Sequence, residues 1–302
     1  MKGILTGLSF FIGIAFLGCN KNPGKVGSEP QSPTSGTLGL VADESFAPIL
    51  EDQLMVFRSS YPKANIAVSY KAENQLLNYF LNDTVRVAVM ARTLTPQEAS
   101  IFERKQIKVR VNRIAVDAVA LIANKASGDT AITVQEIIDI MKGKSGIKKL
   151  VFDNANSSTV RYLKELSGVE NLPENGIYAL KSNPEVIRYV HNNLGAIGVI
   201  GVNWVKDPGP EIAPLMDKVR ILGVKNLPGK LGSDKFYKPN QNNLALELYP
   251  LKRDLYIINC QGGGGLGMGF SSFLASERGQ RIVLKSGLLP DSIPSREIFI
   301  RK

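Results

Sequence analysis

The chain has 302 residues, of which 44% are hydrophobic, enough to build two domains of ordinary size. Its formal net charge is +10, but the 37 Lys and Arg are spread along the chain and do not alternate with aromatic residues. This pattern argues against a nucleic-acid partner, and a dispersed positive charge suits the capture of small anions.

The N-terminus has the pattern of an export signal. Met1-Lys2 precedes an apolar run from Ile4 to Leu17, which is shorter than the ~20 residues that span a bilayer. The run ends at Gly18-Cys19 and resembles the lipobox of bacterial lipoproteins, in which the cysteine is lipidated. We therefore predict a signal peptide over residues 1–18 and a protein of the periplasm or cell envelope, anchored to a membrane through lipid on Cys19.

Residues 19–35 are almost free of apolar side chains after the cysteine, which predicts a disordered tether. Cys260 is the second of two cysteines, so lipidation of Cys19 leaves it without a disulfide partner. It follows an apolar run and is expected to be a small buried side chain.

The next part of the chain alternates strand and helix patterns, which predicts an α/β protein whose mostly parallel sheet is flanked by helices. Thr95-Pro96-Gln97-Glu98 has the residues of a capping box with proline in the first helical turn. The expected strands cover residues 36–42, 66–70 and 85–90, and the expected helices cover 47–60, a segment after Glu73, and a segment after Thr95.

Residues 109–124 form one long apolar run rich in Val, Ala and Ile. An extended chain of this length reaches about 40 Å, longer than one sheet usually needs. We expect this strand to leave one domain and enter another. Further on, the patterns predict strands ending at Phe152 and covering 194–201 and 255–259, and helices over 132–141, 183–190 and 270–284.

Three loops with hydroxyls or arginines follow predicted strands: Asp43 to Phe46, Ala91 to Thr93, and Asn156 to Thr159. In open α/β sheets, ligands bind outside the carboxyl ends of the strands. Ser157, Ser158 and Thr159 stand where a helix begins, and Arg161 follows them, so N–H groups, hydroxyls and a guanidinium meet there. The alternative is an ordinary serine N-cap with a solvated arginine.

Glu73 is a carboxylate close to this expected anion site. It is expected to orient Arg92 or Arg161, or to accept a proton from a ligand that still carries one, which would favour hydrogen phosphate over sulfate. Arg92 follows the apolar strand over 85–90, so we place it at the mouth of the cleft rather than in a surface salt bridge.

Enzyme, metal and cofactor motifs are not evident. The single histidine, His191, lies at an expected helix end, and no nucleophile elbow, Walker loop or Cys/His cluster occurs. Gly262 to Gly269 is interpreted as a flexible loop before a helix rather than a dinucleotide fingerprint. We predict a non-enzyme without metal or cofactor; the alternatives are an exported hydrolase using Ser157 or Ser158, and a ligand-free surface-assembly or adhesion lipoprotein.

The chain resembles the phosphate-type substrate-binding proteins of ABC transporters, within the type II periplasmic-binding superfamily, and looks most like a lipoprotein branch. The segments that carry the resemblance lie in order at residues 43–48, 89–95, 152–161, 195–199 and 269–280. It implies two α/β lobes joined by two crossing strands, with lobe 1 over residues 36–116 and 259–302 and lobe 2 over 117–258.

The same resemblance implies the ligand and its contacts. Inorganic phosphate or a similar oxyanion would bind between the lobes and pass to a membrane permease, and we expect the protein to be a monomer. The residues implied or proposed to bind the anion come from both lobes: Ser45, Phe46, Arg92, Ser157, Ser158, Thr159 and Arg161. Where many members have an Asp that accepts the phosphate proton, this chain has Ala91-Arg92, so the choice between phosphate and sulfate stays open.

Overall fold

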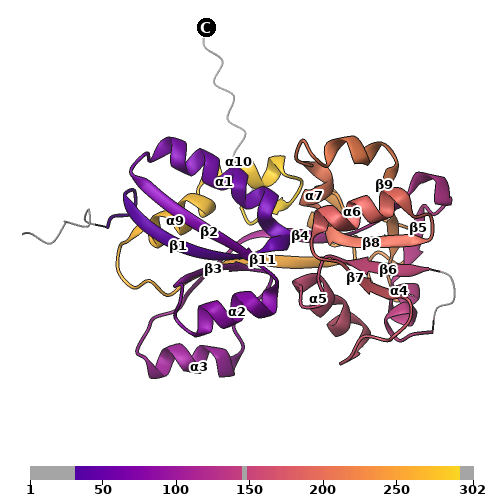
Figure 1. Ribbon diagram of the computed structural model, residues 1–302, viewed down its shortest axis with the longest axis horizontal. Coiled ribbons are helices and arrows are strands. Elements are labelled where there is room, and N and C mark those ends of the chain that lie inside the picture. Colours follow the sequence, from indigo (N-terminus) through magenta and orange to yellow (C-terminus); the bar gives the residue numbers. More distant parts are fainter. Residues whose placement is uncertain (1–30, 145–147, 293–302) are drawn as a thin grey trace, which may run out of the picture.

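The computed structural model describes residues 31–144 and 148–292, which form two α/β lobes side by side (Figure 1). The predicted signal peptide and Cys19 lie outside the described residues. The predicted tether runs to residue 35, but the chain is already folded from Gln31: Ser32 pairs with Ser35, and Pro33 packs against Gly269. Within the described part of the chain, no helix has both the length and the apolar character needed to cross a membrane.

The first lobe begins with the predicted alternation of strands and helices. Helix α3 starts as the sequence predicts, because Thr95 accepts from the Glu98 N–H and the Glu98 carboxylate accepts from the Thr95 N–H. The elements are β1 (Gly36–Asp43), the 3-10 turn η1 (Glu44–Phe46), α1 (Ala47–Ser60), β2 (Ala64–Lys71), α2 (Glu73–Leu81), β3 (Val87–Met90), α3 (Pro96–Arg104) and β4 (Arg110–Asn124).

The second lobe follows β4, and the chain then returns to the first lobe. The second-lobe elements are η2 (Lys125–Ser127), β5 (Ala131–Thr133), α4 (Val134–Met141), β6 (Lys149–Phe152), α5 (Ser158–Ser167), β7 (Ile177–Ala179), α6 (Asn183–Asn192), β8 (Ala196–Gly201), α7 (Asn203–Lys206), η3 (Ala213–Asp217), β9 (Val219–Ile221), β10 (Gly223–Lys225) and α8 (Gln241–Ala245). The returning elements are β11 (Lys252–Asn259), α9 (Leu266–Ala275), α10 (Glu277–Lys285) and β12 (Leu289–Pro290).

One sheet runs through both lobes in the order β2-β1-β3-β11-β4-β8-β6-β7, and β5 pairs with β10 apart from it. Strands β1, β2 and β3 are parallel, as are β6, β7 and β8, so each lobe contributes one parallel set of strands to this sheet. The carboxyl ends of β1 and β6 both face the junction between the lobes, as the contacts described below show. This arrangement confirms the predicted fold class.

Strand β4 joins the two lobes, as the long apolar run predicted. Its first part, residues 110–118, pairs with β11, and its second part, residues 119–123, pairs with β8. Figure 1 shows β4 and β11 crossing the middle of the molecule. β11 pairs with β4 from Lys252 onward and with β3 from Tyr256 onward.

Apolar side chains fill both lobes, and their burial stabilises the fold. In the first lobe, α1 turns the stripe Leu50, Leu54 and Phe57 inward, where Phe57 meets Phe270 and Phe273 of α9. Cys260 is buried as expected, and burial raises the pKa of its thiol to about 11.

The predicted single helix over residues 270–284 is wrong, because the segment forms two helices. Ser276 adopts an extended backbone (φ −70°, ψ 162°) and caps α10 by accepting from the Gly279 N–H. The predicted glycine loop ends earlier than expected, since residues 266–269 belong to α9. Gly269 allows the Pro33 carbonyl to approach closely, where an added Cβ would lie 1.7 Å from the oxygen.

Candidate functional site

A buried polar cluster lies where the two lobes meet. From the first lobe, β1 ends in Asp43, and Ser45 and Phe46 follow in η1; all three are fully buried. From the second lobe, Ser158 opens α5 and is also fully buried. Arg253, at the start of β11, connects the two sets.

Arg253 is 5% exposed, and its guanidinium contacts residues of both lobes. Its Nε donates to Asp117 Oδ2 at 2.8 Å, and its Nη1 donates to Ser158 Oγ at 2.8 Å. The guanidinium carbon lies 4.7 Å from the centre of the Phe46 ring, a cation–π contact. Asp117 is the directly opposite residue on β4, so the register of the crossing strands creates this ion pair.

Several buried polar atoms of the cluster have no partner among the described residues. They are Asp43 Oδ2, Ser45 Oγ, Asp117 Oδ1 and Arg253 Nη2. Buried donors and acceptors are nearly always paired in folded proteins, because an unpaired one costs about 1–3 kcal/mol. The cluster therefore has two kinds of unused groups: donors on Arg253 and Ser45, and acceptors on two aspartates.

The cluster is rich in carboxylates. Burial raises the pKa of Asp43, of Asp117 and of Asp153, while the nearby Arg253 guanidinium opposes each rise. The Ser158 hydroxyl also counters the rise at Asp43, which shows that α5 reaches the end of β1. One guanidinium thus stands among three buried carboxyl groups.

The predicted residues Ser157 and Thr159 hold the start of α5. Ser157 is the N-cap: its Oγ accepts from the Val160 N–H at 3.3 Å and lies 2.7 Å from Thr159 Oγ1. Thr159 donates to Asp153 Oδ1 at 2.7 Å. Of the three consecutive hydroxyl residues, Ser158 is the one that contacts Arg253, and the N-cap interpretation holds for Ser157.

Arg161 and Arg92 both contact Glu73, which lies at the start of α2 and is 1% exposed. Arg161 donates to Glu73 through Nε at 2.5 Å and Nη2 at 3.1 Å, and Arg92 Nε lies 3.6 Å from the same carboxylate. Glu73 therefore contacts both arginines, and its role toward a ligand stays a prediction.

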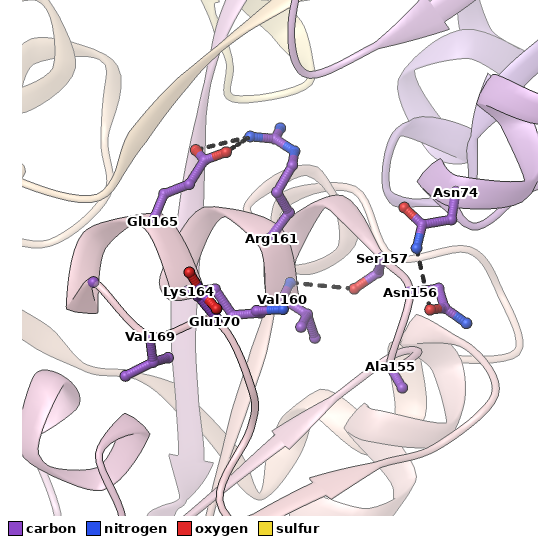
Figure 2. A pocket seen from close by; sticks show the side chains of 11 residues that line it. Asn74, Ala155, Asn156, Ser157, Val160, Arg161, Lys164, Glu165, Val169 and Glu170 are labelled. Atoms are coloured by element: carbon purple, nitrogen blue, oxygen red, sulfur yellow. Dashed lines mark hydrogen bonds and ion pairs between the residues drawn. The ribbon is translucent and has the colours of Figure 1, made fainter. Parts of the chain in front are cut away.

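Each arginine also has a second carboxylate. Arg92 donates to both Glu98 oxygens through Nη1 and Nη2, whereas Arg161 donates to both Glu165 oxygens through Nη1 alone, which Figure 2 shows. The network has three carboxylates for two guanidinium groups and joins α2 of one lobe to α5 of the other. A direct contact of either arginine with an anion stays a prediction.

A cavity of about 430 Å³ lies beside α5 (Figure 2). Ser157 and Arg161 line it, and Asn74 reaches it from the first lobe, where its side chain donates to Asn156 at 3.2 Å. Ser45, Ser158 and Arg253 do not line it. The cavity is therefore distinct from the buried cluster.

Sequence reasoning missed Arg253 and Asp117. Asp117 is a lone acid within the apolar run of β4, and a buried carboxylate needs a partner, so this position carried a usable signal. Arg253 had only a weak one, since a single cation before an apolar strand is common. The histidine lies apart from the cluster, where His191 Nδ1 is 3.0 Å from the Leu215 carbonyl oxygen, and no described group of His, Cys, Asp and Glu has the arrangement of a metal site.

Comparison with known proteins identifies the family to which the chain belongs. The model of the PBP superfamily domain matches residues 27–278, most of the chain. A search of curated protein sequences finds no match.

Solved structures share the fold at low sequence identity. A Clostridium perfringens protein described as a candidate phosphate ABC transporter substrate-binding protein, with bound phosphate, is 19% identical with a TM-score of 0.69, covering 85% of this chain and 100% of that one. An ABC-type phosphate transport receptor from Vibrio cholerae is 19% identical with a TM-score of 0.62, covering 84% and 100%. The chain therefore belongs to the PBP superfamily and has its two-lobed type II fold.

Proposed function

We propose that the protein is a lipid-anchored, non-catalytic receptor that captures inorganic phosphate or a similar oxyanion between its lobes for an ABC importer. Membership of the PBP superfamily supports a binding rather than a catalytic role. The two structural neighbours are described as phosphate-transport proteins of the ABC type, which supports phosphate as the ligand and an ABC importer as the partner, and the N-terminal sequence pattern supports an anchor at Cys19.

The observation that carries this proposal is the buried cluster around Arg253. An anion at this position would meet the unpaired Arg253 Nη2 and the Ser45 hydroxyl, beside Ser158, so both lobes and a crossing strand would contribute. Charge-assisted hydrogen bonds of a buried arginine to an oxyanion are among the stronger polar interactions in proteins. We place Arg253, Ser45 and Ser158 in direct contact with the ligand.

The remaining predicted residues take supporting roles in this proposal. Ser157, Thr159 and the Phe46 ring hold Ser158 and Arg253 in place. Arg161 and Glu73 link the two lobes through their ion pair, and Arg92 contacts the same Glu73 carboxylate from within the first lobe. Both arginines are also paired with a neighbouring acid.

The unpaired acceptors favour a ligand that carries a proton. Asp43 Oδ2 and Asp117 Oδ1 would each face an anion without a donor if sulfate were bound. Hydrogen phosphate and dihydrogen phosphate offer an O–H to such an acceptor, whereas sulfate at neutral pH offers none. We therefore propose phosphate ahead of sulfate.

A thermal-shift panel tests the proposed function. Phosphate at 100 times its Kd should stabilise the folded protein by about 2.7 kcal/mol, and sulfate at the same concentration by much less. The Ser158→Ala variant should lose most of the phosphate response, while Ser272→Ala, an exposed change on α9, should keep it. An unchanged melting temperature with every oxyanion would contradict the proposal.

A further inference from the structure

Glu44 joins the two lobes by a contact outside the cluster around Arg253. It belongs to η1 of the first lobe, and its carboxyl group reaches Asn183, the first residue of α6 in the second lobe. The Asn183 side chain donates to Glu44 Oε2 at 2.5 Å, and the Asn183 backbone N–H donates to Glu44 Oε1 at 3.4 Å. Ser182 is the N-cap of α6, and Glu44 adds an acceptor at the first residue of this helix only when the lobes are close together.

A second carboxyl group shares the same amide. Asn183 Nδ2 also lies 3.3 Å from Asp153 Oδ2, so Glu44 and Asp153 approach each other across the junction. Asp43, the residue before Glu44, adds a third acid. Carboxyl groups that share a site in this way do not all ionise, because their negative charges repel at short range.

Two cations stand at the edge of this acid group. A cavity of about 180 Å³ is lined by Glu44 and Asp153 together with Tyr70, Lys71 and Lys181. The Lys71 ammonium lies 4.5 Å over the Tyr79 ring, and Lys181 is exposed. Neither lysine forms a described ion pair with Glu44, so the carboxyl group has a hydrogen-bond donor but no bound countercharge.

We propose that Glu44 couples closure of the lobes to the uptake of one proton, and that the neutral Glu44 carboxyl group holds α6 in the closed protein. The inference rests on the proposed function, since closure is taken as the step that retains the ligand. Opening would move Glu44 away from Asn183 and Asp153 and return it to water.

The direction of the pH effect follows from this geometry. Burial and the nearby Asp153 raise the pKa of Glu44 in the closed protein from 4.5 to about 8. In the open protein an exposed carboxyl group keeps its ordinary pKa. Between these two values the closed form holds a proton that the open form lacks, so closure is favoured as the pH falls and the effect is lost as the pH rises through about 8.

Two measurements on the full chain test the inference. The first follows the side-chain carboxyl carbon of Glu44 by NMR as a function of pH, without and with phosphate, with the resonance assigned by its loss in Glu44→Gln. The second measures phosphate affinity calorimetrically at pH 6 and pH 8. Affinity should fall between these pH values about 50-fold more in the wild type than in Glu44→Gln.

The matched control is Glu103→Gln, which removes an exposed carboxylate from α3 and should leave the wild-type pH dependence unchanged. The ionisation of phosphate itself affects all variants equally and cancels in the comparison. A Glu44 midpoint near pH 8 with phosphate, no lower than the midpoint without phosphate, supports the inference. A midpoint near 4.5 in both, or equal pH dependence in the wild type and Glu44→Gln, overturns it. Absence of heat with phosphate would count against the proposed function, while the NMR titration still decides the role of Glu44.

Discussion

Replacing Arg253 with methionine separates the charge of this residue from its volume. The change leaves Asp117, which is fully buried, without its 2.8 Å ion pair, and removes the donor to Ser158 and the contact with Phe46. Breaking a buried ion pair from one side typically costs about 3–5 kcal/mol of unfolding free energy, because the other charge stays buried. We expect a loss of this size in urea denaturation at pH 7.

A second substitution tests the cause of that loss. Asp117→Asn in the same chain removes the uncompensated charge, so the double variant should recover much of the unfolding free energy. It should still bind phosphate about 10- to 150-fold more weakly than the wild type, since a charge-assisted hydrogen bond is worth about 1.5–3 kcal/mol. A loss below about 1 kcal/mol in the single variant, or wild-type phosphate affinity in the double variant, would refute the role given to Arg253.

Four further experiments test other parts of the account. Ser157→Ala should lower the unfolding free energy by about 1 kcal/mol through loss of the N-cap and weaken phosphate binding less than Ser158→Ala does, as measured by urea denaturation and calorimetry. Glu73→Gln should lower the unfolding free energy by about 1–2 kcal/mol, and Glu165→Gln should lower it by about 0–1 kcal/mol because the Arg161–Glu165 pair is exposed. Thermal melting measures both effects, and equal effects would contradict an interlobe role for Glu73. Gly198→Ala should cost about 1–3 kcal/mol, since its Cβ would lie 2.7 Å from Val186 and 2.8 Å from Ile122, whereas Gly195→Ala meets nothing within 4 Å and should cost less than 1 kcal/mol. Cys260 should react slowly with a thiol reagent at pH 8 in the folded protein and quickly in urea, because burial raises its pKa to about 11; fast labelling of the folded protein would contradict its position.

The longer elements of the fold could be predicted because they have strong local signals, whereas the short strands β7, β9, β10 and β12 and the short helices α7 and α8 were not predicted. The capping box at Thr95 and the apolar run of β4 specify a helix start and a crossing strand without reference to the rest of the chain. The break at Ser276 was missed because a serine inside an apolar helical pattern costs little, and its capping geometry depends on how Gly279 packs against the preceding helix.

The candidate site was only half predictable. Ser45 and Ser158 follow strands, so their position at the lobe junction could be inferred from topology. The pairing of Arg253 with Asp117 depends on the register of two strands more than 130 residues apart, which no local pattern encodes. Glu73 could be named as a partner of Arg92 or Arg161, but the acids Glu98 and Glu165 were overlooked, although they lie only six and four residues after the arginines that they pair with.

The most direct measurement of the central claim is isothermal titration of the purified protein with phosphate and, separately, with sulfate at pH 7. The account predicts saturable heat with one phosphate per chain and at least tenfold weaker binding of sulfate. Absence of heat with both anions, or tighter binding of sulfate, would contradict it.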